Sequence, residues 1–277
     1  MNLDAYFNRI GYTGSQDASL ETLQQLHLLH PQAIPFENLS SFVAQGDANS
    51  VSLDPEAVFD KLVVNGRGGY CFEQNLLFAE ILTALGFEVS THAARVIWRG
   101  VEKSQAPRTH MLLKISLDGS SYIADVGFGG LTMTAPILLD SGSEQTSPHE
   151  KFRITSEDEP DTYTISALLG DTWKSMYVFD LSSQQAADYE LANYYVSTHC
   201  KSPFVNNLIV ARPFKNGRHA LMNNSYAKYT RDGQKIEKEI SDKEELLSLL
   251  KDIFKIRLEG ALDNESLGKK LDAIAAQ

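Results

Sequence analysis

The hydrophobic pattern of this chain changes its period at Gly86. Before this glycine, the apolar run that starts at Leu76 has the length and the helix-forming side chains of a buried helix, and a glycine commonly follows a helix end. After it, segments rich in β-branched and aromatic residues are separated by turn signals such as Asp118-Gly119, which is typical of antiparallel strands. The sequence therefore predicts an α+β fold in which a helical part precedes a β-rich part.

Four segments follow from this pattern. Residues 1–86 are predicted to be helical, with helix starts at Ser19 and Asp54, both residue types that cap helices. Residues 87–183 are predicted to be β-rich, 184–202 to hold a linking helix, and 203–277 to contain strands followed by a helix. The predicted strands are 89–98, 111–117, 122–128, 152–155, 163–168, 173–179, 207–212, 219–230 and 235–240.

Charge and cysteine content restrict the class of protein. The formal net charge of −11 argues against nucleic acid as the main partner, since nucleic-acid binders need a basic face. The N-terminus lacks the pattern of a signal peptide, and no run approaches about 18 apolar residues, so we expect a cytoplasmic protein without a membrane partner. A reducing compartment argues against a disulfide between the two cysteines, Cys71 and Cys200.

Cys71 lies in the run 67–75, Arg-Gly-Gly-Tyr-Cys-Phe-Glu-Gln-Asn, directly before the apolar helix. At a helix N-terminus, unpaired N–H groups and the positive end of the dipole favour a thiolate, the nucleophilic form of cysteine. The glycine pair is expected to permit a tight turn and to leave the sulfur accessible. This run by itself is equally compatible with a buried structural cysteine.

His110 lies at the head of one apolar strand of a predicted hairpin, and Asp125 interrupts the other. If Asp118-Gly119 is a two-residue turn, Asp125 pairs with Leu112 and shares a sheet face with His110. A turn at Gly119-Ser120 would keep both on one face but further apart, whereas a three-residue loop would put the two side chains on opposite faces. An aspartate beside a histidine is either a structural hydrogen bond or the group that orients a catalytic imidazole.

A metal centre is not expected. One cysteine, one histidine and one aspartate without a C-x-x-C or H-E-x-x-H pattern fall short of the usual zinc signatures. His27 and His30 lie three residues apart on the helix that follows Ser19, and we expect them on a partly exposed helix face rather than at a metal.

Several motifs together resemble the arylamine N-acetyltransferase family, in its bacterial form. In chain order they are Pro35-Phe36-Glu37-Asn38-Leu39, Arg67-Gly68-Gly69-Tyr70-Cys71-Phe72-Glu73, Thr109-His110, Asp125-Val126-Gly127-Phe128-Gly129, and Ser197-Thr198-His199 with Ser202-Pro203-Phe204. The resemblance implies an N-terminal helical bundle, a central β-barrel and a C-terminal α/β lid. It also implies a cysteine-protease-like triad of Cys71, His110 and Asp125 at the domain junction.

The resemblance further implies ping-pong acetyl transfer through an acetylated Cys71. The donor would be acetyl-CoA, the acceptor an arylamine, arylhydrazine or N-hydroxyarylamine, and no metal would take part. The positions that match the family's acceptor pocket, each of which also has an ordinary core interpretation, are Phe36, Val96, Phe128 and Phe204. The positions expected near the coenzyme are Thr109, Gly129 and Gly130.

Two further expectations come from motif positions. Arg67 and Glu37 are predicted to form a buried pair that holds the loop before Cys71. Cys200 stands where relatives commonly have proline, and we take it as incidental. The chain is expected to be a monomer or a weak homo-oligomer.

Three alternatives remain at the level of sequence. The same triad could serve an amide synthase that joins an amine to an acyl chain. A cysteine hydrolase shares the triad logic but would not carry the Asp-Val-Gly-Phe-Gly motif. A scaffold without activity is disfavoured because all three triad positions are filled.

Overall fold

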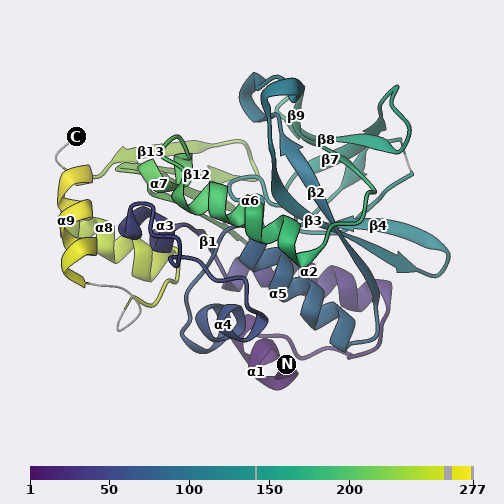
Figure 1. Ribbon diagram of the computed structural model, residues 1–277, viewed down its shortest axis with the longest axis horizontal. Coiled ribbons are helices and arrows are strands. Elements are labelled where there is room, and N and C mark those ends of the chain that lie inside the picture. The colour runs from purple at the N-terminus through teal and green to yellow at the C-terminus, as the bar shows by residue number, and fades with distance from the viewer. Residues whose placement is uncertain (141, 259–263, 276–277) are drawn as a thin grey trace.

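The computed structural model describes residues 1–140, 142–258 and 264–275 (Figure 1). The helices are α1 Leu3–Ile10, α2 Leu20–Ala33, α3 Leu39–Ala44, α4 Pro55–Phe59, α5 Cys71–Ala84, α6 Ala186–Thr198, α7 Pro203–Asn206, α8 Lys243–Ser248 and α9 Asn264–Ala275. The strands are β1 Phe36–Glu37, β2 Glu88–Val96, β3 Arg108–Leu117, β4 Ser120–Ala124, β5 Ile137–Leu138, β6 Gln145–Thr146, β7 Lys151–Ser156, β8 Thr162–Leu169, β9 Thr172–Asp180, β10 Ile209–Phe214, β11 Gly217–Met222, β12 Ser225–Thr230 and β13 Lys235–Glu239.

The helix boundaries follow local capping chemistry. The Ser19 side chain accepts the Thr22 N–H at the start of α2, and the Asp54 side chain caps α4. Helix α5 begins at Cys71, as predicted. Gly86 follows its end with a φ angle of 89°, a conformation that glycine adopts without steric cost.

One sheet, eight-stranded within the described residues, has the order β5-β4-β3-β2-β9-β8-β7-β6 and antiparallel pairing. Strand β5 at one edge also contacts β7, next to the other edge, so the sheet curls into a nearly closed barrel. The β3–β4 hairpin pairs Leu113 with Ala124, which is the register that a two-residue turn at Asp118-Gly119 predicts. The two-residue strands β5 and β6 were not predicted, because two residues carry no periodic signal.

A second sheet has the order β1-β10-β11-β12-β13 within the described part of the chain. Its strand β1 comes from the helical N-terminal part and pairs Phe36 with Ala211 of β10, which the sequence pattern did not predict. The segment 219–230, predicted as one strand, forms the two strands β11 and β12. Asn223 breaks it with a φ angle of 56°, a conformation that asparagine tolerates better than most residues.

We call β10 to β13 together with α8 and α9 the lid. In Figure 1 it occupies the left of the molecule, the barrel lies at the upper right, and α6 crosses between them. Of the predicted lid segment 203–277, residues 259–263 and 276–277 lie outside the described residues. The segment boundaries at 86, 183 and 202 stay predictions.

Within residues 1–140, 142–258 and 264–275, buried apolar side chains form three clusters. The first joins the N-terminal helices to one face of β2 and β3, through residues such as Met111 and Leu113. The second fills the lid and includes Leu39 of α3. The third fills the barrel. Cys71 belongs to the first cluster, where the helices meet the barrel strands. No helix in the described ranges is long and apolar enough to cross a membrane.

Candidate active site

Cys71 is the first residue of α5 and is buried. The backbone N–H of Tyr70 donates to the Glu73 carboxylate at 3.0 Å, which ties the segment before the helix to its first turn. The sulfur faces the barrel, because Sγ lies 3.6 Å from the carbonyl oxygen of Thr109. The start of α5 therefore places Cys71 beside the N-terminal end of strand β3.

The glycine pair before Cys71 is required for close packing. A Cβ atom on Gly68 would lie 2.1 Å from the carbonyl oxygen of Pro35, and one on Gly69 would lie 2.6 Å from the Glu73 carboxylate. Neither glycine has a positive φ angle, so the expected tight turn is not the reason for glycine here. The reason is the backbone contact with β1, where Glu37 N–H donates to Gly69 O at 3.1 Å.

Arg67 and Glu37 form the predicted buried pair. Arg67 Nε and Nη2 donate to Glu37 Oε1 at 2.9 and 2.7 Å, and both side chains are at most 2% exposed. Glu37 Oε2 also accepts the Leu39 N–H at 2.6 Å. Removing either partner would leave a buried charge without its counter-charge, which is strongly destabilising. The pair therefore holds β1 against the loop before Cys71.

His110 and Asp125 are in direct contact, with 2.7 Å between Nε2 and Oδ2. Asp125 is fully buried and accepts three further hydrogen bonds, from Tyr177 Oη–H at 3.0 Å, from Asn75 Nδ2–H at 3.0 Å and from Gly127 N–H at 2.9 Å. Because Nε2 is engaged by the carboxylate, Nδ1 is the ring nitrogen left to hydrogen-bond the Cys71 side chain.

The electrostatics of this group favour a charged imidazole. Burial lowers the pKa of His110, but the charge and hydrogen bond of Asp125, together with the hydrogen bond and charge of Cys71, outweigh it and raise the pKa from 6.5 to about 10. Burial raises the pKa of Asp125, but His110 and the hydrogen-bond donors around the carboxylate bring it below its usual value. The site therefore stabilises an imidazolium beside a carboxylate.

Two side chains that contact Asp125, Asn75 and Tyr177, were not singled out from the sequence. Asn75 also donates to Met111 O at 2.7 Å and accepts the Val126 N–H at 3.0 Å. A signal for it existed, because it lies four residues after Cys71 and hence on the same helix face. Tyr177 comes from β9, and nothing in its local sequence distinguishes it from an ordinary strand residue.

The prediction that His27 and His30 lie on a partly exposed face is wrong, because both are fully buried. They follow the buried Leu23 and Leu26 by four residues each, a spacing that places all four on one face. His27 Nε2 accepts the backbone N–H of Asp125 at 3.2 Å, and burial lowers its pKa to about 4, which keeps the ring neutral.

The predicted acceptor-pocket positions contact the neighbours of Cys71 in two separate groups. The Phe36 and Phe204 rings are tilted against each other with centroids 6.0 Å apart, and Phe204 also stands edge-on to Tyr70. Phe128 stands edge-on to the His110 ring, with 5.3 Å between centroids. Val96 is the last residue of β2 and pairs with Tyr177 of β9. It is therefore connected to His110 and Asp125 through Tyr177.

The residues predicted near the coenzyme are not equivalent. Thr109 contacts the Cys71 sulfur and lines a cavity of about 650 Å³ beside α6. Gly129 has a φ angle of 85°, and a Cβ atom there would lie 3.5 Å from the Phe36 ring. Gly130 is exposed, and a Cβ atom added to it would have nothing within 4 Å.

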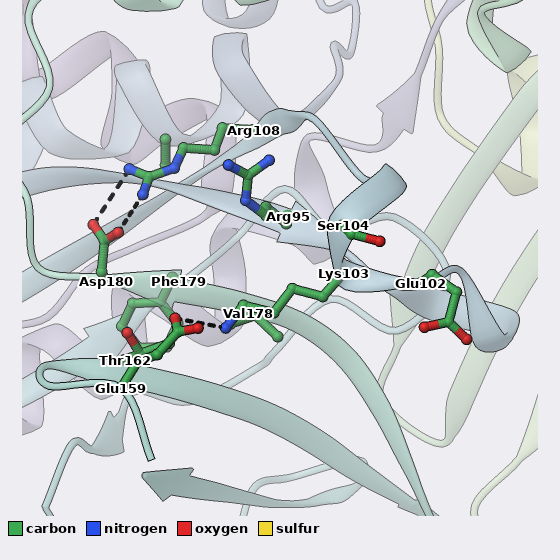
Figure 2. A pocket seen from close by; sticks show the side chains of 11 residues that line it. Arg95, Glu102, Lys103, Ser104, Arg108, Glu159, Thr162, Val178, Phe179 and Asp180 are labelled. Carbon is green, nitrogen blue, oxygen red and sulfur yellow. Dashed lines mark hydrogen bonds and ion pairs between the residues drawn. The ribbon is translucent and has the colours of Figure 1, made fainter. Parts of the chain in front are cut away.

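A second cavity, of about 570 Å³, shares Arg108 with the first. In Figure 2, Arg108 is paired with Asp180 and Lys103 with Glu159 on the barrel side. The residues that line these two cavities do not include Cys71, His110 or Asp125. Thr109 is therefore the link between the cysteine and the larger cavity. In the described part of the chain, no group of three or more His, Cys, Asp or Glu side chains is arranged to hold a metal ion.

Similarity to known proteins covers almost the whole chain. A family model described as N-acetyltransferase matches residues 19–262. The arylamine N-acetyltransferase of Mycobacterium tuberculosis is 36% identical, over 100% of this chain and 97% of the relative. The Salmonella typhimurium arylamine N-acetyltransferase / N-hydroxyarylamine O-acetyltransferase is 36% identical over 91% of this chain and 88% of its own.

Solved structures agree with the fold. The arylamine N-acetyltransferase structure from M. tuberculosis matches with a TM-score of 0.90 at 36% identity, over 98% of this chain and 100% of that one. The Mycobacterium marinum enzyme in complex with CoA matches with a TM-score of 0.91 at 32% identity, over 99% of both chains. The chain belongs to the arylamine N-acetyltransferase family of acyltransferases.

Proposed function

We propose that this protein transfers an acetyl group from acetyl-CoA to arylamines, arylhydrazines or N-hydroxyarylamines, through an acetylated Cys71. The observation that carries the proposal is the contact series from the Cys71 side chain through His110 to the buried Asp125. Family membership supports the reaction class, and the M. marinum relative was solved with CoA. The roles of the three residues are part of the proposal.

In the first half-reaction, Cys71 Sγ attacks the thioester carbonyl carbon of acetyl-CoA as a thiolate. Backbone N–H groups at the start of α5, including that of Cys71, are the donors available to the developing oxyanion. The bond between the carbonyl carbon and the coenzyme sulfur then breaks. Protonated His110 gives its Nδ1 proton to the departing coenzyme thiolate and becomes neutral.

In the second half-reaction, the amine nitrogen attacks the carbonyl carbon of acetyl-Cys71. Neutral His110 takes a proton from this nitrogen, the bond between the carbonyl carbon and Sγ breaks, and the amide leaves. Cys71 returns to a thiolate beside protonated His110. The raised pKa of His110 supports this pairing, and Asp125 holds the ring in place in both half-reactions.

The remaining predicted positions enter as binding residues. We assign the acceptor ring to the group Phe36, Val96, Phe128 and Phe204. The assignment is supported by the contact of Phe204 with Tyr70, next to Cys71, and of Phe128 with His110. We assign the coenzyme to the side of Thr109, because Thr109 joins the sulfur to the 650 Å³ cavity. Gly129 and Gly130 do not line this cavity, and their assignment to the coenzyme rests on the family resemblance alone. A reducing cytoplasm, which keeps the thiol free, and a monomer or weak homo-oligomer complete the proposal.

Acylation of the cysteine is the direct test. Incubation with p-nitrophenyl acetate is expected to add one acetyl group, located at Cys71 by peptide mass spectrometry, and an arylamine or arylhydrazine is expected to discharge it. Cys71→Ala should form no adduct, while Cys200→Ser, changed at the exposed cysteine, should behave as wild type. No adduct on the wild-type protein, or an equal adduct on Cys71→Ala, would refute the mechanism. Discharge by large amines alone would favour an amide synthase.

A further inference from the structure

Arg218 on β11 joins the lid to the loop that follows Asp125. Its side chain is 4% exposed, Nε donates to Glu150 Oε1 at 2.6 Å, and Nη2 pairs with Glu150 Oε2. Nη2 also donates to the backbone carbonyl of Thr132 at 3.0 Å. Burial lowers the pKa of Arg218 to about 9, which leaves the guanidinium charged at neutral pH. A planar fork that contacts both a carboxylate and a carbonyl fixes the position of each.

Thr132 passes this constraint to the loop 128–132. The threonine is 2% exposed, and its Oγ1 accepts the backbone N–H of Phe128 at 2.7 Å. Its own N–H donates to the carbonyl of Gly129 at 3.1 Å. The loop is thus closed by two hydrogen bonds to Thr132, whose carbonyl is held by Arg218.

Phe128 is the last residue in the series of contacts from Arg218 through Thr132, and it lies at the proposed active site. Its ring stands edge-on to His110, with 5.3 Å between centroids and 88° between planes, and lies 5.3 Å from the ring of Tyr177. Both of these neighbours contact the Asp125 carboxylate. The loop backbone therefore decides where the Phe128 ring meets the imidazole.

We propose that Arg218 and Thr132 are positioning residues that set the aromatic acceptor side of the site by fixing Phe128 from the lid. The inference rests on the proposed acetyl transfer. A buried ion pair is weak evidence for stability, because the desolvation of both charges offsets their attraction. The geometry points to a role in specificity for an aromatic acceptor. Acylation of Cys71 and its discharge by a small nucleophile are expected not to depend on the contact between Arg218 and Thr132.

The test compares two nucleophiles on the acetyl-enzyme. After acylation by p-nitrophenyl acetate, the rate of discharge is measured with phenylhydrazine and with hydrazine, which has no ring. Thr132→Val removes the acceptor for the Phe128 N–H at nearly constant volume, and the phenylhydrazine-to-hydrazine rate ratio is expected to fall about tenfold. Thr132→Ser keeps the hydroxyl and should restore the wild-type ratio. Arg218→Lys keeps the charge but loses the fork, and should lower the ratio in the same direction.

Each outcome separates this inference from the proposed function. A wild-type ratio in Thr132→Val and Arg218→Lys, or an equal slowing with both nucleophiles, would overturn the positioning role while leaving acetyl transfer intact. Absence of the Cys71 adduct on the wild-type enzyme would overturn both. If Thr132→Val does not fold, Arg218→Lys against Thr132→Ser supplies the same comparison.

Discussion

Asp125 connects more of the site than any other single residue described above. Its two oxygens accept hydrogen bonds from a histidine, a tyrosine, an asparagine and a backbone N–H, and its own N–H donates to His27. A carboxylate with this many donors stays ionised although it is buried. His110 gains its charge from this arrangement, because burial by itself would lower its pKa.

Asp125→Asn is expected to weaken the dependence of stability on pH. The folded-state pKa of His110, about 10, lies above the unfolded value of 6.5. The stabilisation from its charge is therefore complete below pH 6.5 and is lost as pH rises through 10. Urea unfolding at pH 6.5 and 9.5 should show a larger loss in the wild type than in the variant, and acetyl transfer should fall on the order of 10²–10⁴-fold.

Asp171→Asn, in the exposed turn between β8 and β9, is the matched control and should leave both the activity and the pH dependence unchanged. If the wild type and Asp125→Asn lost the same free energy of unfolding between the two pH values, the charge of His110 would not depend on Asp125.

At the scale of elements, the start of α5 depends on a strand of two residues. The glycine run lies against β1, and Gln74 supports the same contact by donating to Pro35 O at 2.8 Å and Gly69 O at 3.2 Å. Gln74 in turn accepts from His30 Nε2–H at 2.7 Å. The position of Cys71 is thus set jointly by α2, β1 and α5.

Gly68→Ala is expected to disturb this junction. The new Cβ would meet Pro35 O at 2.1 Å and Glu37 Cγ at 2.8 Å, and neither can move without breaking β1 or the Arg67 pair. We expect a loss of about 1–3 kcal/mol in the free energy of unfolding, together with slower acylation of Cys71. Both are measurable by urea unfolding and by the p-nitrophenyl acetate burst.

Gly268→Ala in α9 is the corresponding control, because nothing lies within 4 Å of the added Cβ. It should stabilise the protein by about 0.5–1 kcal/mol, as an alanine does inside a helix. Equal stability of Gly68→Ala and the wild type would show that the backbone at Pro35 can yield.

At the scale of the whole molecule, the lid is not a separate attachment. It takes strand β1 from the N-terminal part of the chain, and Leu39 and Phe42 of α3 pack into its core. It reaches the barrel through Arg218 and through His149, whose Nε2–H donates to Phe214 O at 2.7 Å. The proposed site therefore lies where three parts of the chain meet.

Asn38 connects two distant parts of the chain, because it hydrogen-bonds the backbone of residues 204–209. Its removal is expected to weaken the contact between these parts. Its Nδ2 donates to Phe204 O and Asn207 O, both at 2.7 Å, and its Oδ1 accepts the Ile209 N–H at 2.7 Å. Asn38→Ala leaves at least two of these backbone groups without a partner, and we expect a loss of about 2–3 kcal/mol in the free energy of unfolding.

Asn49→Ala, at an exposed loop position, should change that free energy by less than about 0.5 kcal/mol. Asn38 holds the backbone carbonyl of Phe204, a residue of the proposed acceptor pocket. Acetyl transfer to a bulky arylamine should therefore fall in Asn38→Ala more than transfer to hydrazine. Wild-type stability and wild-type acceptor preference in Asn38→Ala would contradict the role of Asn38 in connecting these two parts of the chain.

Much of the site was predictable because its signals are local. The apolar, helix-forming run after the glycine pair placed Cys71 at a helix start. The two-residue turn at Asp118-Gly119, one of the alternatives considered, gives the register observed up to Ala124, and Asp125 directly after this strand contacts His110. Both depend on neighbours within one helix or one hairpin, where the geometry of the backbone dictates which side chains share a face.

The α+β order and the place of Cys71 at a helix start follow from local sequence patterns, and a two-residue turn at Asp118-Gly119 favoured a shared side for His110 and Asp125. The packing of distant segments is needed to explain why β1 joins the lid, His27 is buried behind Asp125, Tyr177 reaches its carboxylate and Arg218 reaches Thr132. These contacts join residues far apart in the chain. No local period encodes them, because they depend on which finished surfaces pack against each other.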